Sequence, residues 1–152
     1  MFDFQRMYHT GMTVRDIDAA VARMSDALNL EFAVIKTFDP LPFWTPEKGS
    51  HEVVVSATYS KQGPQHLELV QGTGAFYNPD AHPDSRHIGV WVDDLPAEAA
   101  RLIGAGWQVS AAGAPPEEGY GVLAYLQPPG GGIMVELVST DLMPVFADWL
   151  AE

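Results

Sequence analysis

Apolar and polar residues alternate along residues 86–93, and this stretch leads directly into a helical pattern. The aliphatic positions are Ile88, Val90 and Val92, and the positions between them are His87, Gly89 and Trp91. A period of two indicates a strand, so these two sets are expected on opposite faces. Asp94 can cap the helix predicted from Leu95 onward. A histidine on the face opposite an aliphatic row is a candidate for a functional site.

The same pattern occurs earlier in the chain, at residues 8–17. The matching pairs include His9/His87, Gly11/Gly89, Val14/Val92 and Asp16/Asp94, each 78 residues apart. A fixed offset across a strand and the following helix indicates an internal repeat. We therefore predict one domain over residues 1–152, built from a first module at about 7–72 and a second at about 86–140.

Both predicted modules end on a glutamate between aliphatic residues. Glu68 lies between Leu67 and Leu69, and Glu136 lies between Val135 and Leu137. In a strand, period two places such a glutamate on the face opposite its aliphatic neighbours. The glutamate follows its module's histidine by 59 residues in the first copy and by 49 in the second. The additional length in the first copy is expected in a loop.

The remaining pattern completes two strand–helix–strand–strand–strand modules. In the first, we predict a helix at 16–28 and strands at 31–37, 53–59 and 65–71, while three prolines and a glycine argue against regular structure over residues 38–50. In the second, we predict a helix at 95–103 and strands at 107–110, 122–127 and 133–139. A final helix at about 142–150 has a broad apolar surface that must pack on the sheet or on a second subunit.

The predicted fold is thus α+β, with two paired βαβββ modules forming a curved mixed sheet around a cleft. Pairing the modules would direct four side chains into one space: His9, Glu68, His87 and Glu136. Two imidazoles and two carboxylates suit one divalent ion, namely Zn, Ni, Co, Mn or Fe, whereas calcium prefers more oxygen ligands. Such an ion polarises a carbonyl and acidifies the adjacent C–H, and Glu136 or another nearby carboxylate could take that proton. Taken singly, each residue is equally explained as an ordinary strand position.

Charge and composition exclude several classes of binding partner. The formal net charge is −12, with only eight lysines and arginines and no cysteine. Nucleic acid and anionic membranes are therefore poor partners, and thiolate chemistry is excluded. No apolar stretch of membrane-spanning length and no secretory signal is evident, so we expect a cytoplasmic protein. Few basic residues are present to bind the phosphates of a coenzyme A thioester.

The repeated motifs YHTGMTVRDI, HLELVQ, RHIGVWVDDL and GGGIMVELV resemble the vicinal oxygen chelate superfamily, which includes glyoxalases, epimerases, extradiol dioxygenases and bleomycin resistance proteins. The resemblance implies a metal cleft whose ligands fall on His9, Glu68, His87 and Glu136. TPEKG is similar to the loop that bears a catalytic carboxylate in methylmalonyl-CoA epimerases, which implies a catalytic role for Glu47. The expected activity is therefore that of a metal-dependent epimerase, isomerase or glyoxalase-type lyase. A ferrous extradiol-type dioxygenase and a metal-free binding or resistance protein remain alternatives.

Aromatic residues suggest where a small-molecule substrate would bind. Phe43 and Trp44 fall in the longer part of the first module, where we expect a lid or wall for an apolar ligand, and Trp91 lies on the same face as His87. The alternative is that the aromatic residues are buried against the sheet or in a dimer interface. We expect a homodimer. A largely uncharged, apolar substrate fits the acidic chain best.

Overall fold

The computed structural model describes residues 2–82 and 86–152, and it contains the repeat as two successive sets of the same elements. The first set is β1 (Met7–Thr13), α1 (Ile17–Leu28), β2 (Lys36–Thr45), β3 (Gly49–Tyr59) and β4 (His66–Gly72). The second set is β5 (His87–Val92), α2 (Leu95–Gly104), β6 (Gln108–Ala112), β7 (Leu123–Gln127) and β8 (Met134–Ser139). Helix α3 (Met143–Leu150) follows, and short 3₁₀ turns lie at Phe4–Arg6, Pro116–Glu118 and Thr140–Leu142.

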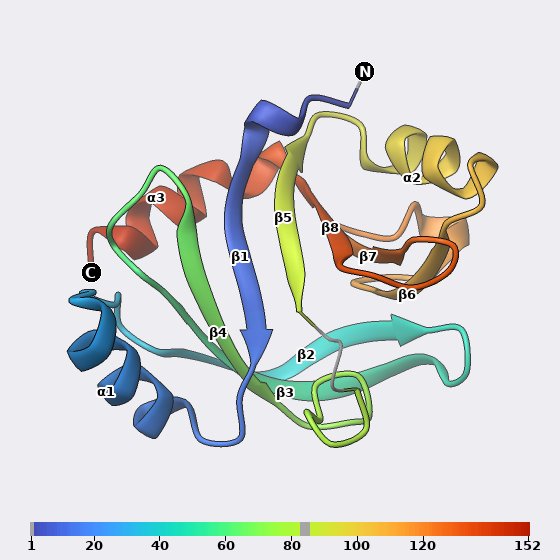
Figure 1. Cartoon of the computed structure of the whole chain (residues 1–152). Coiled ribbons are helices and arrows are strands. Elements are labelled where there is room, and N and C mark those ends of the chain that lie inside the picture. The colour runs from blue at the N-terminus through green and yellow to red at the C-terminus, as the bar shows by residue number, and fades with distance from the viewer. Residues whose placement is uncertain (1, 83–85) are drawn as a thin grey trace.

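The eight strands form one closed, mixed sheet in the order β1-β4-β3-β2-β6-β7-β8-β5. Each module contributes one parallel pair, β1 with β4 and β5 with β8, and the two modules meet where β1 runs antiparallel to β5. Helices α1 and α2 lie outside the strands at opposite sides of the molecule (Figure 1). This arrangement confirms the predicted α+β fold of paired βαβββ modules.

The helix ends also follow the repeat. The side chain of Asp16 accepts a hydrogen bond from the backbone N–H of Ala19 at the start of α1, and Asp94 does the same for Ala97 in α2. Each bond satisfies one of the backbone donors that a helix start leaves unpaired. Asn29 ends α1 in the left-handed conformation, with φ of 54°. The predicted cap at Asp94 is therefore confirmed.

The prediction of irregular structure over residues 38–50 was wrong, because most of this stretch belongs to β2 and the start of β3. The register of β2 against β3 shifts between Phe38 and Leu41, so Pro40 lies in a bulge that needs no regular ladder bond. On its other side, β2 pairs with β6 only at Trp44 and Ala112. Over residues 31–37 the expected strand reduces to an isolated bridge at Phe32 and the first residues of β2.

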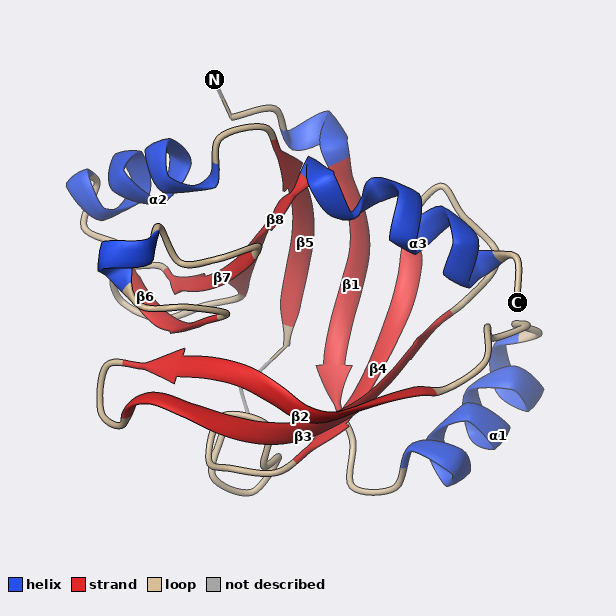
Figure 2. Cartoon of the chain, turned by 180° about the vertical axis from the view of Figure 1, so that it is seen from behind, coloured by secondary structure: helices blue, strands red, loops and turns tan. Residues whose placement is uncertain are grey.

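Helix α3 covers the sheet on one side. It lies in front of β1 and β4 in Figure 2 and behind them in Figure 1, so it crosses the face toward which the barrel opens. The indole Nε1–H of Trp149 donates a hydrogen bond of 2.7 Å to the carbonyl of Val34, which ties the end of α3 to the segment before β2. Within the described residues, no helix is both long and apolar enough to cross a membrane.

Candidate metal centre

The site is built from two equivalent rows of residues across the sheet. In one row, Gly11 of β1 lies between Glu68 of β4 and His87 of β5. In the other row, Gly89 of β5 lies between His9 of β1 and Glu136 of β8. Each row thus holds a glutamate and a histidine on either side of a glycine, and each histidine comes from the opposite module.

The two glycines make room for the histidine rings. A Cβ added at Gly89 would lie 1.9 Å from Cε1 of His9, and one added at Gly11 would lie 2.2 Å from Cε1 of His87. Real side-chain atoms do not approach this closely. The absence of a side chain at each glycine therefore leaves room for the imidazole ring of the other module.

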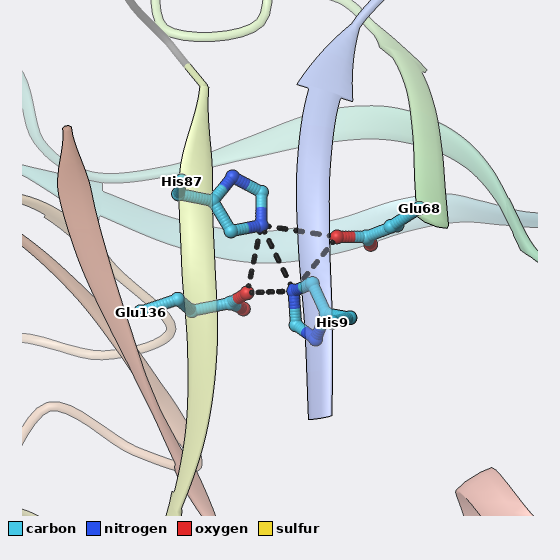
Figure 3. Close-up of side chains that lie close together, drawn as sticks. All are labelled: His9, Glu68, His87 and Glu136. Atoms are coloured by element: carbon cyan, nitrogen blue, oxygen red, sulfur yellow. Dashed lines mark hydrogen bonds and ion pairs between the residues drawn. The ribbon is translucent and has the colours of Figure 1, made fainter. Parts of the chain in front are cut away.

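The four predicted side chains converge from four strands (Figure 3). Nε2 of His9 lies 3.0 Å from Nε2 of His87, 3.0 Å from Oε2 of Glu136 and 3.1 Å from Oε2 of Glu68. Nε2 of His87 lies 3.0 Å from each of the same two carboxylate oxygens. All four side chains are buried, with no more than 6% of any residue exposed.

These separations fit the donor set of a divalent ion. Ligands at about 2.1 Å from an octahedral ion are roughly 3.0 Å apart when adjacent, which is the spacing of five of the six atom pairs here. All four ligand atoms lie within 4.8 Å of one another, and the two carboxylates lie on either side of the histidines (Figure 3). In addition, Nδ1 of His9 is buried without a hydrogen-bond partner among the described residues. The residues present therefore suit one metal ion.

The charges in the centre depend strongly on one another. Burial by itself lowers the pKa of each histidine, but the carboxylates of Glu68 and Glu136 outweigh burial; they raise the pKa of His9 and raise that of His87 to about 10. Burial likewise raises the pKa of each glutamate, and the two imidazoles reverse this effect, so both carboxyl pKa values are lowered. Without an ion His87 therefore holds a proton at neutral pH, which a metal must displace when it binds.

Two tyrosines extend the rows and were not identified from the sequence. Tyr59 of β3 is the cross-strand partner of Glu68, and Tyr125 of β7 is the cross-strand partner of Glu136. The hydroxyl of Tyr125 lies 3.3 Å from that of Tyr77. Burial raises the pKa of both Tyr59 and Tyr125, so they stay neutral hydrogen-bond donors. The sequence signal that could have identified them is a tyrosine in the third strand of each module.

One cavity of about 280 Å³ reaches the carboxylates of Glu68 and Glu136. Its walls are largely aromatic: Tyr8, Phe38, Tyr59, Tyr77, Trp91, Tyr125, Phe146 and Trp149. Trp91, expected on the face of His87, lies in this wall and stacks on Tyr8 with ring centroids 3.9 Å apart. Phe38 also contributes to the wall. The centre therefore opens into a small apolar chamber.

The structure does not bring Phe43, Trp44 or Glu47 to this cavity. Because β2 and β3 form a long hairpin, Glu47 lies in the turn at its far end and lines a separate cavity of about 890 Å³. Phe43 is buried against Phe76 and lines that second cavity as well. Trp44 packs in the cluster of apolar residues beneath α2. The expected lid over the metal cleft is thus a paired strand instead.

The comparisons with known proteins agree with this fold. Residues 8–125 match the family described as the Glyoxalase/Bleomycin resistance protein/Dioxygenase superfamily. The chain belongs to this superfamily, also called the vicinal oxygen chelate superfamily. None of the curated proteins compared with the chain matches it.

Solved structures with the same fold include a hypothetical protein from Bacillus halodurans, at 17% identity and a TM-score of 0.59, which covers 88% of this chain and 93% of that one. A variant of the Streptomyces coelicolor methylmalonyl-CoA epimerase in complex with 2-nitronate-propionyl-CoA is similar at 20% identity and a TM-score of 0.56, over 88% and 96% of the two chains. The methylmalonyl-CoA epimerase of Mycobacterium tuberculosis is similar at 17% identity and a TM-score of 0.54, over 91% and 92%. At these identities the likeness establishes the fold.

Proposed function

We propose that this protein is a divalent-metal-dependent enzyme that moves a proton next to a carbonyl group of a small, uncharged, apolar substrate. The reaction would be that of an epimerase, an isomerase or a glyoxalase-type lyase. The observation that carries the proposal is the convergence of two buried imidazoles and two buried carboxylates at separations of 3.0–3.1 Å. When bound there, zinc, nickel, cobalt, manganese or iron would polarise a carbonyl oxygen and acidify the adjacent C–H.

The complete set of four ligands favours this proposal over its alternatives. A ferrous extradiol-type dioxygenase needs two histidines and one carboxylate, yet Glu68 and Glu136 lie equally close to His87. A metal-free binding protein needs neither the two histidines nor the two glutamates. Four converging ligand atoms in a buried site are costly to maintain without an ion that balances them.

The proton acceptor we propose is a carboxylate of the centre itself, and Glu136 is the first choice. Both Glu136 and Glu68 line the apolar cavity, so a substrate held there is within reach of their oxygens. Glu47 lines the other cavity and is kept as the competing prediction, because the resemblance to epimerases points to it.

The surroundings of the cavity support a neutral substrate. The methylmalonyl-CoA epimerases with this fold act on a coenzyme A thioester, whose phosphates need cationic partners. No lysine or arginine is among the residues that line the cavity of this chain. Several cations are already paired with acids elsewhere: Arg6 with Asp93, Arg15 with Asp80, Lys36 with Glu152, Lys61 with Glu31 and Arg101 with Glu98.

Titration of the metal-free protein with zinc, followed by calorimetry, tests the metal centre. We expect one ion per chain, and we expect His87→Ala and Glu136→Ala to weaken binding by roughly a hundredfold or more, since even groups behind the ligands contribute about 10–100-fold. His51→Ala is the matched control, because His51 lines the other cavity and should bind zinc as the wild type does. A folded wild-type protein that binds no zinc, nickel, cobalt, manganese or ferrous iron contradicts the proposal.

Solvent deuterium exchange at the C–H next to the carbonyl of neutral ketones, measured by NMR at saturating metal, tests the base. Glu136→Gln should slow exchange by about 100-fold or more, as expected for loss of a general base. Glu47→Gln should leave both exchange and metal content unchanged. If Glu47→Gln abolishes exchange while the metal stays bound, the base is Glu47 and our assignment of Glu136 fails.

A further inference from the structure

Helix α3 stands outside the two repeated modules, yet it forms part of the wall of the cavity beside the metal centre. Val145, Phe146 and Trp149 of α3 line the cavity, together with Leu142 immediately before the helix. The modules supply the four candidate ligands and the other walls, and α3 lies in front of β1 and β4 in Figure 2. The size of the chamber therefore depends on residues that the repeat does not contain.

The ring of Phe146 in α3 contacts aromatic side chains of three barrel strands. Its ring centroid lies 4.9 Å from that of Tyr8, 4.9 Å from that of Tyr59 and 5.9 Å from that of Trp91, with interplanar angles of 67–87°. Edge-to-face contacts at these distances are favourable, and they hold the ring in one place. The ring is therefore a fixed part of the wall and leaves its position only if α3 moves.

The cavity beside Glu68 and Glu136 is small for a small-molecule site. Its volume of about 280 Å³ is close to the lower limit of about 300 Å³ for small-molecule sites. Among the residues that the structure describes, Glu68 and Glu136 are the only charged ones that line it, and the remaining lining residues are aromatic or aliphatic. Removal of the Phe146 ring would join the space it occupies to the chamber.

We propose that Phe146 is a specificity-determining residue that sets the largest neutral, apolar ligand able to lie beside Glu68 and Glu136. The role of Phe146 in selecting the substrate rests on the proposed function. The limit that its ring sets on the space inside the protein does not. The Phe146 ring occupies the α3 side of the chamber, so it limits how far a ligand beside the two carboxylates can extend towards α3.

Binding of toluene, naphthalene and biphenyl to the metal-free protein, followed by ligand-observed NMR and calorimetry, tests this assignment without any activity. Apolar cavities bind such hydrocarbons directly. The wild type should bind toluene most tightly of the three. Phe146→Ala should bind biphenyl at least tenfold more tightly than the wild type, with a much smaller change for toluene. Phe146→Trp should weaken toluene binding.

Asp148→Ala is the matched control, because Asp148 lies on the same helix but is exposed and does not line the cavity. It should reproduce the wild-type order of affinities. If Phe146→Ala does not fold, Phe146→Leu replaces it in the test. We expect this variant to show a smaller gain in affinity for biphenyl. The assignment is overturned if the wild type binds none of the three, if it binds biphenyl as tightly as toluene, or if Phe146→Ala changes all three affinities equally.

The zinc titration separates this inference from the proposed function. Phe146 is not a ligand, so Phe146→Ala should bind zinc with wild-type stoichiometry. Loss of zinc binding in the wild type, together with the predicted hydrocarbon selectivity, would refute the metal enzyme and leave the role of Phe146 standing. Zinc binding without hydrocarbon selectivity would refute the role of Phe146 and leave the metal enzyme standing.

Discussion

At the scale of single residues, the geometry of the candidate metal centre depends on two glycines. Gly11 and Gly89 occupy equivalent positions in the repeat, and each lies beneath the imidazole of the other module. Both lie in strands, where glycine is otherwise unfavourable because it adds flexibility and packs nothing. Their value is the close approach they allow between the backbone and a ring.

Gly89→Ala should therefore displace His9 and damage the centre. The added methyl would meet a ring at 1.9 Å, and His9 is fully buried, so the ring has no free space to enter. We expect zinc affinity to fall at least tenfold and the free energy of unfolding to fall by about 1–3 kcal/mol, the usual cost of overpacking. Calorimetry and urea unfolding measure the two quantities.

Gly104→Ala is the control for this substitution. An added Cβ at Gly104, the last residue of α2, meets no atom within 4 Å, so the variant should keep wild-type zinc affinity. Unchanged zinc binding in Gly89→Ala would show that His9 can bind from a different ring position, contrary to our account of the two rows.

At the scale of elements, α3 is held by one specific hydrogen bond and by packing. The Trp149 indole is buried and donates to the carbonyl of Val34 at 2.7 Å, while Lys36 lies over its ring and pairs with Glu152. The ion pair is half exposed and contributes little. The hydrogen bond and the buried ring therefore carry most of the attachment.

Trp149→Phe should keep much of the packing but lose this hydrogen bond. Because the Val34 carbonyl would be left without its indole donor, we expect a loss of about 1–2 kcal/mol in the free energy of unfolding, measured with urea. Trp107→Phe makes the same change in ring size in a different apolar cluster and provides the baseline. Equal losses in the two variants would mean that the hydrogen bond to Val34 contributes nothing.

At the scale of the whole molecule, several large apolar side chains near the cavity are exposed. They are Val34, Phe38, Val122, Met143 and Val145, and three of them, Phe38, Val122 and Val145, also line the cavity. Exposed apolar surface gathered in one region is typical of an interface. The homodimer expected from the sequence stays a prediction, and this region is its most suitable contact.

Sedimentation equilibrium tests the oligomeric state. We expect twice the mass of one chain, and we expect Met143→Glu to shift the equilibrium towards the monomer by placing a charge in the contact. Ile103→Glu is the matched control, since Ile103 is equally exposed but lies at the end of α2. A wild-type protein that sediments as a monomer at high concentration contradicts the prediction.

The sequence by itself determined the repeat, most of the elements, the helix caps and the convergence of His9, Glu68, His87 and Glu136. These features follow from local rules: alternation assigns residues to one face of a strand, and a constant offset makes two modules equivalent. Because a pair of equivalent modules shares one centre, four residues far apart in the chain could be placed together before any coordinates were known.

Only the tertiary structure decided which other residues surround that centre. The prolines of β2 are tolerated because the strand has a bulge and little pairing on its second side, and the resulting hairpin carries Glu47 and Phe43 away from the ligands. The glycine gaps beneath the rings and the partners Tyr59 and Tyr125 depend on the register between strands. Register and the packing of α3 are set by contacts between distant segments, and no local pattern in the chain encodes them.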